Sequence, residues 1–262
     1  MFIIVNKFKK ERELKRDFQK TNALDIDMKN PEFENGILLG AKCCQIQEAY
    51  IPRGVQKINP NAFFDCKQLK TVLIPKTVTH IGDNAFAGCE NLEEVTIPAS
   101  VQYIGNRAFH NCRNLKRVIF EGKEKVYARV ELGSFVFAGC ESLEEVKFNE
   151  SLLYVPSYAF YDCKSLTQLE LPDSCQQVRE KAFEGSGIEK LRLGVNLLVD
   201  DFDLTSIKNL NNLSEISIPR HNANAYSSRL FVNGIHCRVV EEIDYQDKVK
   251  MPIYDKEEGM VR

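Results

Sequence analysis

The sequence has little net charge, few histidines and no long hydrophobic run, and each shortage excludes a class of function. Its 262 residues carry 37 acidic and 35 basic side chains, which gives a formal net charge of −2. Binding to nucleic acid by bulk phosphate neutralisation needs a net basic surface, so no nucleic-acid partner is expected. The longest apolar runs are as short as Phe2–Val5, and no segment is long enough to span a bilayer.

Motifs for catalysis and metal binding are also missing. The chain has no G-x-S-x-G sequence, no P-loop and no dinucleotide-binding fingerprint. The histidines show no H-x-x-x-H spacing and none stands beside a cysteine pair, as zinc ligands commonly do. They are His80, His110, His221 and His236. We therefore expect no enzyme activity, no metal site and no cofactor.

What the sequence does contain is an internal repeat with a period of 23 residues. Residues 85–107 read AFAGCENLEEVTIPASVQYIGNR, and residues 62–84, 136–158 and 159–181 follow the same pattern. The copy at residues 108–135 carries five extra residues. Weaker copies extend the pattern back to position 39 and forward to position 219, so the chain holds about eight rungs. A period of this length lies within the range of leucine-rich repeats.

Each rung predicts a short strand that follows a turn. In the rung of residues 62–84, Val72 and Ile74 should point inward while Thr71 and Leu73 point outward, because side chains alternate along a strand. A proline often follows and ends the strand, since proline has no N–H to donate. One rung cannot bury its apolar side chains alone, so we expect the rungs to stack into a parallel sheet.

The repeated phrase [IL]-P-x-x-V-x-x-I-G-x-x-A-F-x-x-C-x-x-L resembles the BspA-type leucine-rich repeat family. Residues 74–92 and 97–115 match it almost letter for letter. The resemblance implies a mainly β repeat solenoid with a parallel sheet, short turns or helices and capped ends. It implies binding rather than catalysis, and some members are surface proteins that bind host glycoproteins. Residues 218–226 are similar to the family's closing segment, a short helix carrying a tyrosine, with a final strand then expected at residues 236–240.

We divide the chain into three parts. Residues 1–38 are an N-terminal cap, residues 39–219 the solenoid, and residues 220–262 a C-terminal cap with a helix, a final strand and a tail. Residues 7–20 carry a narrow apolar stripe that predicts a helix over the first rung, where an open end would expose core and strand edge. The compartment stays open: the resemblance implies a cell-surface or secreted protein, whereas Met1 as the native start favours the cytoplasm.

Six of the nine cysteines form a column with one thiol per rung. They are Cys43, Cys66, Cys89, Cys112, Cys140 and Cys163. Such a column does not supply the four converging ligands of a zinc site, and an odd total argues against complete disulfide pairing. We predict that the column consists of buried free thiols that act as small apolar fillers. Cys44 and Cys237 lie outside it and are the candidates for reactive thiols.

The outward columns of the strands are where binding would be encoded. The first column alternates in charge at Lys70, Glu93, Lys116 and Glu144, and Arg117 follows in the second. Neighbours in a column can pair along the sheet, although each exposed pair is worth only about 0.2–1 kcal/mol. Two interpretations stay open: a self-neutralised solvated face and a mixed-charge docking surface.

A third outward column is apolar over its N-terminal half, at Tyr50, Leu73, Thr96 and Ile119. Exposed apolar side chains in a row can mark an interaction patch. The alternative is that they cover the sheet or contact the N-terminal cap.

Residues 121–133 interrupt the period and are the other candidate. Insertions in solenoids become loops, often on the binding face. Lys123, Lys125, Tyr127 and Arg129 would form a basic and aromatic finger or an extra hairpin strand. Loop drift without function is the alternative.

Together these patterns predict a monomeric, non-catalytic module that binds a protein or glycoprotein. The alternatives are a structural repeat protein that assembles with itself through an uncapped edge and an intracellular interaction scaffold.

Overall fold

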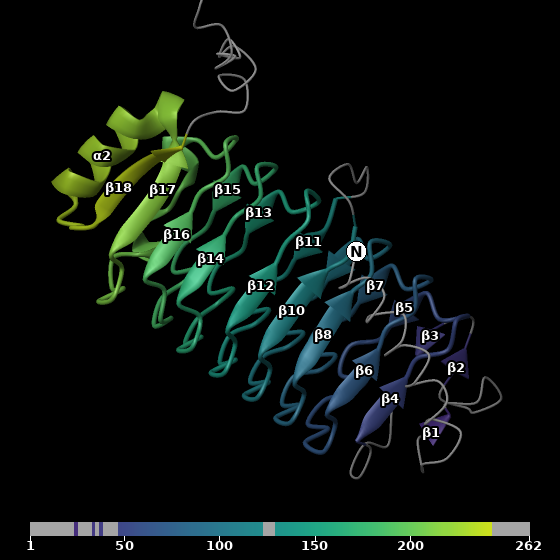
Figure 1. Ribbon diagram of the computed structural model, residues 1–262. Helices are drawn as coiled ribbons and strands as arrows, with labels where there is room; N and C mark the ends of the chain where they lie inside the picture. Colours follow the sequence, from purple (N-terminus) through teal and green to yellow (C-terminus); the bar gives the residue numbers. More distant parts are fainter. Residues whose placement is uncertain (1–23, 26–32, 35–36, 39–46, 123–128, 243–262) are drawn as a thin grey trace, which may run out of the picture.

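The computed structural model describes residues 24–25, 33–34, 37–38, 47–122 and 129–242. Successive rungs stack side by side into a solenoid of about eight turns, about 23 residues apart, with little helix (Figure 1). A rung contributes one strand to a front ribbon and one shorter strand to a back ribbon. The predicted parallel-sheet solenoid is confirmed.

The front ribbon holds the strands predicted from the Leu-x-x-Val-x-Ile pattern. Its members are β1 (Leu24–Asp25), β4 (Glu48–Tyr50), β6 (Thr71–Leu73), β8 (Glu94–Ile97), β10 (Arg117–Phe120), β12 (Glu145–Lys147), β14 (Gln168–Glu170), β16 (Lys190–Arg192), β17 (Glu215–Pro219) and β18 (Arg238–Glu242). Neighbouring strands pair in parallel, in one sheet from β1 to β12 and a second from β14 to β18. The register aligns equivalent positions of successive rungs, for example Val95 with Val118 and Val118 with Val146.

The back ribbon is built from two-residue strands. Its members are β2 (Phe33–Glu34), β3 (Ile37–Leu38), β5 (Lys57–Ile58), β7 (His80–Ile81), β9 (Tyr103–Ile104), β11 (Glu131–Leu132), β13 (Tyr154–Val155) and β15 (Gln177–Val178). Among the described residues, the strand pairings of this ribbon are parallel except that of β2 with β3. The inward residue of each rung here, such as Ile81 or Ile104, is fully buried.

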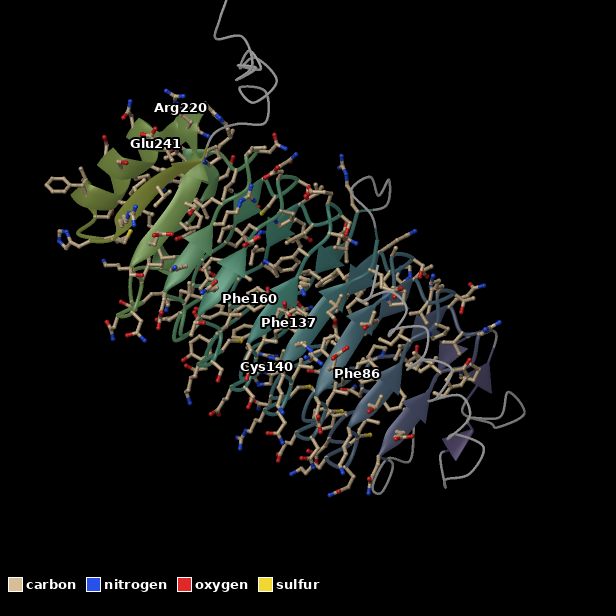
Figure 2. All side chains as sticks on the ribbon, in the orientation of Figure 1. Phe86, Phe137, Cys140, Phe160, Arg220 and Glu241 are labelled. Atoms are coloured by element: carbon tan, nitrogen blue, oxygen red, sulfur yellow. The ribbon has the colours of Figure 1, made fainter. Side chains whose placement is uncertain are left out.

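The core lies between the two ribbons and consists of columns. The Ala-Phe pair of each rung places one phenylalanine above the next, and the ring centroids of Phe63 and Phe86 are 4.9 Å apart with planes 8° from parallel. Phe86 and Phe109 continue the stack at 5.2 Å, and Figure 2 shows further members at Phe137 and Phe160. These rings are fully buried. Because each rung supplies the same ring at the same place, the hydrophobic surface of one rung is covered by the next.

The glycine of the I-G-x-x-A-F phrase marks where the backbones of two rungs come closest. A Cβ atom on Gly105 would lie 2.5 Å from the backbone nitrogen of Asp83 and 2.7 Å from the carbonyl carbon of Gly82. A side chain at position 105 would require the neighbouring backbone to shift, so glycine allows the close approach in this rung.

The C-terminal end is closed by helical turns. Three 3₁₀ turns, η1 (Val199–Asp201), η2 (Leu204–Ser206) and η3 (Arg220–Asn222), lead to α2 (Ala223–Val232). The buried Tyr226 of α2 donates its hydroxyl to the carbonyl oxygen of Leu197 at 3.1 Å. The predicted closing helix with its tyrosine is therefore present.

The final strand lies two residues later than predicted, at Arg238–Glu242 instead of 236–240. The reason is register: Arg238 pairs with Glu215 at the start of β17, and its N–H donates to the carbonyl of Ser214. Residues between Gly234 and Cys237 are used in the turn back from α2.

At the N-terminal end, β1 pairs with β4 and β3 pairs with β5, so both ribbons extend beyond the first complete rung. The predicted helix at residues 7–20 lies outside the described residues, and the three-part division of the chain stays a prediction. Within the described ranges, no helix has the length and apolar character needed to cross a membrane.

Candidate interaction surfaces

The first outward column of the front ribbon is fully solvated. Lys70, Glu93, Lys116 and Glu144 are all exposed, and within the described part of the chain none of the four forms an ion pair. The predicted pairing along this column is wrong, because these residues lie just before the strands begin. The ion pair forms in the second column, where Arg117 donates its Nε to Glu94 at 2.9 Å. The strand register places these two residues opposite each other.

The third column brings its apolar members together as predicted. Tyr50 is in register with Leu73, Thr96 is in register with Ile119, and all four side chains are half-buried on the outer face of β4 to β10. The next residue in the column, Lys147, is exposed. We call Leu73, Thr96 and Ile119 the apolar row.

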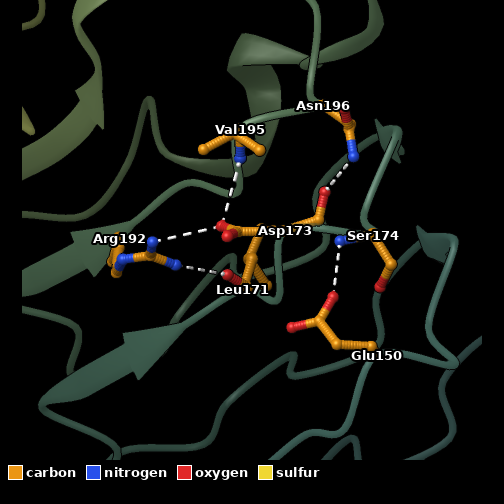
Figure 3. Close-up of polar contacts among 7 residues, drawn as sticks. All are labelled: Glu150, Leu171, Asp173, Ser174, Arg192, Val195 and Asn196. Atoms are coloured by element: carbon orange, nitrogen blue, oxygen red, sulfur yellow. Dashed lines mark hydrogen bonds and ion pairs between the residues drawn. The ribbon is translucent and has the colours of Figure 1, made fainter. Parts of the chain in front are cut away.

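Arg192, in the C-terminal half of the same column, forms hydrogen bonds with the preceding rung, as Figure 3 shows. Arg192 donates Nη2 to Asp173 at 3.1 Å and Nη1 to the carbonyl of Leu171 at 3.2 Å. Asp173 also accepts from the backbone N–H of Val195, and its own carbonyl accepts from Asn196. Arg192 therefore holds two successive rungs together, whereas the described residues form no comparable polar network at the apolar row.

Of the insertion, Lys123, Lys125 and Tyr127 lie outside the described residues. Arg129 is exposed, and directly after it the chain resumes the ordinary pattern with β11. The basic and aromatic finger stays a prediction.

The cysteine column is confirmed as buried and free at four rungs. Each thiol donates to the carbonyl of the core phenylalanine one rung earlier, as in Cys89 to Phe63 at 3.1 Å and Cys140 to Phe109 at 3.2 Å. Cys112 and Cys163 do the same. Burial raises the pKa of Cys89 to about 12. A thiol held neutral in this way is neither a nucleophile nor a metal ligand.

Two predictions about cysteines are wrong. Cys66 is disulfide-bonded and not free; successive positions of a stacked column lie within the separation that a disulfide can bridge. Cys237 is half-buried, and burial raises its pKa, which disfavours the reactive thiolate. Cys43 and Cys44 lie outside the described residues.

The sequence analysis missed an aromatic and cationic array on the turns that follow the back ribbon. The rings of Phe135 and Tyr158 stack with centroids 4.5 Å apart, Arg107 lies over Phe135 at 5.0 Å, and Lys181 lies over Tyr158 at 5.7 Å. We call these four residues the aromatic ladder. A signal was available, because each of them stands directly before the core Ala-Phe or Val-Phe pair of its rung.

Beside the ladder is an open pocket of about 470 Å³, which we call the polar pocket. Its lining residues are Ser157, Gln177, Val178, Arg179, Glu180, Asp200, Asp201, Asp203 and Arg229. They come from β15, η1, α2 and the turns that follow β13, β15 and η1, so nothing in the sequence alone indicates that they meet. No group of three or more His, Cys, Asp or Glu side chains suited to a metal ion occurs among the described residues.

A family model for the BspA-type leucine-rich repeat region matches residues 41–128 and 130–252, with six copies. This chain belongs to that family. The BspA-type repeats account for both ribbons, the phenylalanine stack and the cysteine column. They make the chain a protein-interaction repeat, a fold that generally serves as a scaffold without catalysis.

This chain is also similar to solved structures of leucine-rich repeat proteins. A leucine-rich repeat protein from Eubacterium ventriosum is 31% identical over 59% of this chain and 47% of that chain, with a TM-score of 0.47. This chain thus spans about half of that protein's length. The T. pallidum leucine-rich repeat protein is 24% identical over 74% of this chain and 85% of that chain, with a TM-score of 0.50.

A leucine-rich cell surface protein from Faecalibacterium prausnitzii is 21% identical over 67% of this chain and 60% of that chain, with a TM-score of 0.32. A comparison with curated proteins gives no match.

Proposed function

We propose that this chain is a non-catalytic binding module whose front ribbon docks a protein or glycoprotein partner through the apolar row. The observation that carries the proposal is the row itself. Leu73, Thr96 and Ile119 stand in register on the outer face of β6 to β10, with the two charged columns along one side of the row. Apolar centres with polar rims are typical of protein interfaces.

Rigidity is the physical advantage of such a surface. The side chains of the row are fixed by strands whose inward residues are buried, so little conformational entropy is lost when a partner binds. The charged columns next to the row, with Glu93, Lys116 and Arg117, supply charges that orient the partner. We would screen cell-surface proteins and glycoproteins first, because adhesion at a cell surface is one role of such a module, and intracellular proteins second.

The test compares a double variant, Leu73→Asp with Ile119→Asp, with the wild-type chain. Partners captured by the wild-type chain would be identified by mass spectrometry, purified and measured by surface plasmon resonance. We expect the double variant to bind at least about tenfold more weakly, because it places charges at the centre of a desolvated contact. Circular dichroism would verify that it remains folded.

The matched control is Leu198→Asp, which replaces an exposed leucine (57% exposed) outside the front ribbon. It should bind like the wild-type chain. Equal affinity of the double variant and the wild-type chain would contradict the proposal, as would failure of every purified candidate to bind.

Self-association is a second candidate, favoured by the C-terminal end. Among the described residues β18 pairs only with β17, and Phe231 and Val232 beside it are 75% and 81% exposed. An uncovered edge strand is a template for pairing with another chain. Sedimentation over a wide range of concentrations tests this: a mass that stays monomeric rules it out, whereas a rising mass that Phe231→Ser abolishes supports it.

A further inference from the structure

The polar pocket has a composition that selects its ligand. Eight of its nine lining residues carry polar side chains, and only Val178 does not. Arg179 and Arg229 supply cations, while Glu180, Asp200, Asp201 and Asp203 supply carboxylates. A lipid or a flat apolar cofactor finds too little apolar surface here, and an ion of either sign meets like charges as well as opposite ones.

Its donors are held in place while several of its acceptors are free. Arg179 lies over the ring of Tyr154 at 4.7 Å and donates Nε to Gln177 at 3.3 Å. Arg229 donates to the carbonyl of Val199. The side chains of Asp200 and Asp201 accept no hydrogen bond from the described residues. A fixed guanidinium stacked on a ring keeps N–H groups in its plane for a ligand.

The aromatic ladder adjoins this pocket. Ser157 lines the pocket and precedes Tyr158 of the ladder, whose N–H donates to the carbonyl of the lining residue Glu180 at 3.3 Å. Arg179 connects the pocket to Tyr154 in the back ribbon. From Arg107 to Lys181 the ladder crosses three rung spacings, about 14 Å at the usual strand separation. Pocket and ladder thus form one continuous surface on a single side of the solenoid.

The ladder side chains occupy a backbone conformation that disfavours them. Their φ angles lie between 53° and 59°, in the left-handed region. The two preceding rungs have Asn61 and Asn84 at the same position, with φ angles of 60° and 53°, and asparagine tolerates this conformation. A bulky side chain is disfavoured in this conformation. The fold requires the left-handed backbone conformation at this position but does not require a bulky side chain. Four successive rungs nevertheless carry a bulky side chain here, exposed or half-buried, which points to a role at the surface.

We propose that the polar pocket and the aromatic ladder together bind a neutral carbohydrate chain. Each sugar hydroxyl both donates and accepts, which matches a pocket that offers guanidinium donors and carboxylate acceptors side by side. The faces of the Phe135 and Tyr158 rings are covered by each other and by the two ladder cations, so the rings offer their edges as apolar surface to the C–H groups of a sugar. The pocket has two arginines and four carboxylates, and the two ladder cations bring the charges to equal numbers, which favours a neutral chain over a sialylated or sulfated one. The proposal stands independently of docking by the apolar row.

The experiment uses the full chain on an array of immobilised oligosaccharides. The neutral probes are oligosaccharides of glucose, mannose, galactose and N-acetylglucosamine, and the acidic probes are sialylated and sulfated glycans. The variants are Arg179→Gln and Asp201→Asn in the pocket and Tyr158→Asn in the ladder, which restores the residue type of the earlier rungs. Arg113→Gln, at an exposed arginine on another turn, is the matched control.

We expect the wild-type chain and the Arg113→Gln control to bind a neutral probe equally. Each pocket variant should weaken binding about tenfold, the effect of losing one hydrogen bond to a charged group. Tyr158→Asn should weaken it without loss of the folded circular dichroism spectrum. Absence of binding to every neutral probe overturns the proposal, as does binding confined to acidic probes or unchanged in the pocket variants. Partner binding by the apolar row should survive all three variants, so the two proposals fail separately.

Discussion

At the scale of single residues, the buried thiols link the stability of this protein to pH. The pKa of Cys89 and that of Cys175 are raised by burial from 9.0 to about 12. On unfolding the thiols return to their ordinary pKa, so above a pH of about 9 the unfolded chain releases protons that the folded chain retains. The free energy of unfolding therefore does not depend on these thiols below about pH 9, and it falls steadily as the pH rises toward about 12.

We expect the free energy of unfolding to fall by about 1.4 kcal/mol per pH unit for each such thiol above that threshold. Urea unfolding followed by circular dichroism at a series of alkaline pH values measures the slope. The Cys89→Ser variant should show a shallower slope, since a hydroxyl does not ionise in this range. If the variant and the wild-type chain show the same slope, the pKa of Cys89 is the same in the folded and the unfolded chain, which contradicts the prediction.

A second prediction concerns the close approach of rungs at Gly105. Gly105→Ala places a methyl group against the backbone of Asp83 and Gly82, which cannot move aside without shifting a whole rung. We expect a loss of at least about 2 kcal/mol in urea unfolding. Gly234→Ala is the control: no atom lies within 4 Å of its Cβ, so only the strain of a left-handed φ is added, about 1 kcal/mol. Equal costs at both sites would refute the close-approach argument.

At the scale of elements, the attachment of α2 rests on Tyr226. Its hydroxyl donates to Leu197 at 3.1 Å, and its ring meets Phe202 edge-on with centroids 6.2 Å apart. Tyr226→Phe should cost about 1–2 kcal/mol, because a buried carbonyl loses its donor. Ser227→Ala, at the exposed next residue, should cost almost nothing. If Tyr226→Phe unfolds at the same urea concentration as the wild-type chain, the hydrogen bond does not hold the helix.

At the scale of the whole molecule, stability is a sum over rungs and their interfaces. Deleting residues 85–107 removes one complete rung and joins equivalent positions, so the chain should still fold. We expect a maximum dimension in small-angle scattering shorter by about 4.8 Å, one strand spacing.

Deleting residues 85–96 is the control for this experiment. It removes fewer residues but leaves one rung incomplete, so the rungs before and after it no longer stack at equivalent positions and the free energy of unfolding should fall more than for the whole-rung deletion. A half-rung deletion as stable as the whole-rung deletion, or an unfolded whole-rung deletion, would show that the rungs are not interchangeable units.

The amino-acid sequence was enough to predict the period, the front strand of each rung, the inward columns and the members of the apolar row. These follow from local rules, because alternation along a strand and the repeat length fix which side chains stack. Ile81, Phe86 and Leu92 could be placed in the core without any coordinates, and all three are fully buried.

Which outward residues meet depends on how the chain folds. The polar pocket joins Ser157, Arg179, Asp201 and Arg229, which no repeat position relates to one another. The φ angles of the folded chain show that Phe135 and Tyr158 adopt a left-handed backbone conformation that bulky residues disfavour. The periodic pattern records what every rung shares, namely the core. A binding surface arises where single rungs differ, and the contacts between those differences exist only after the chain has folded.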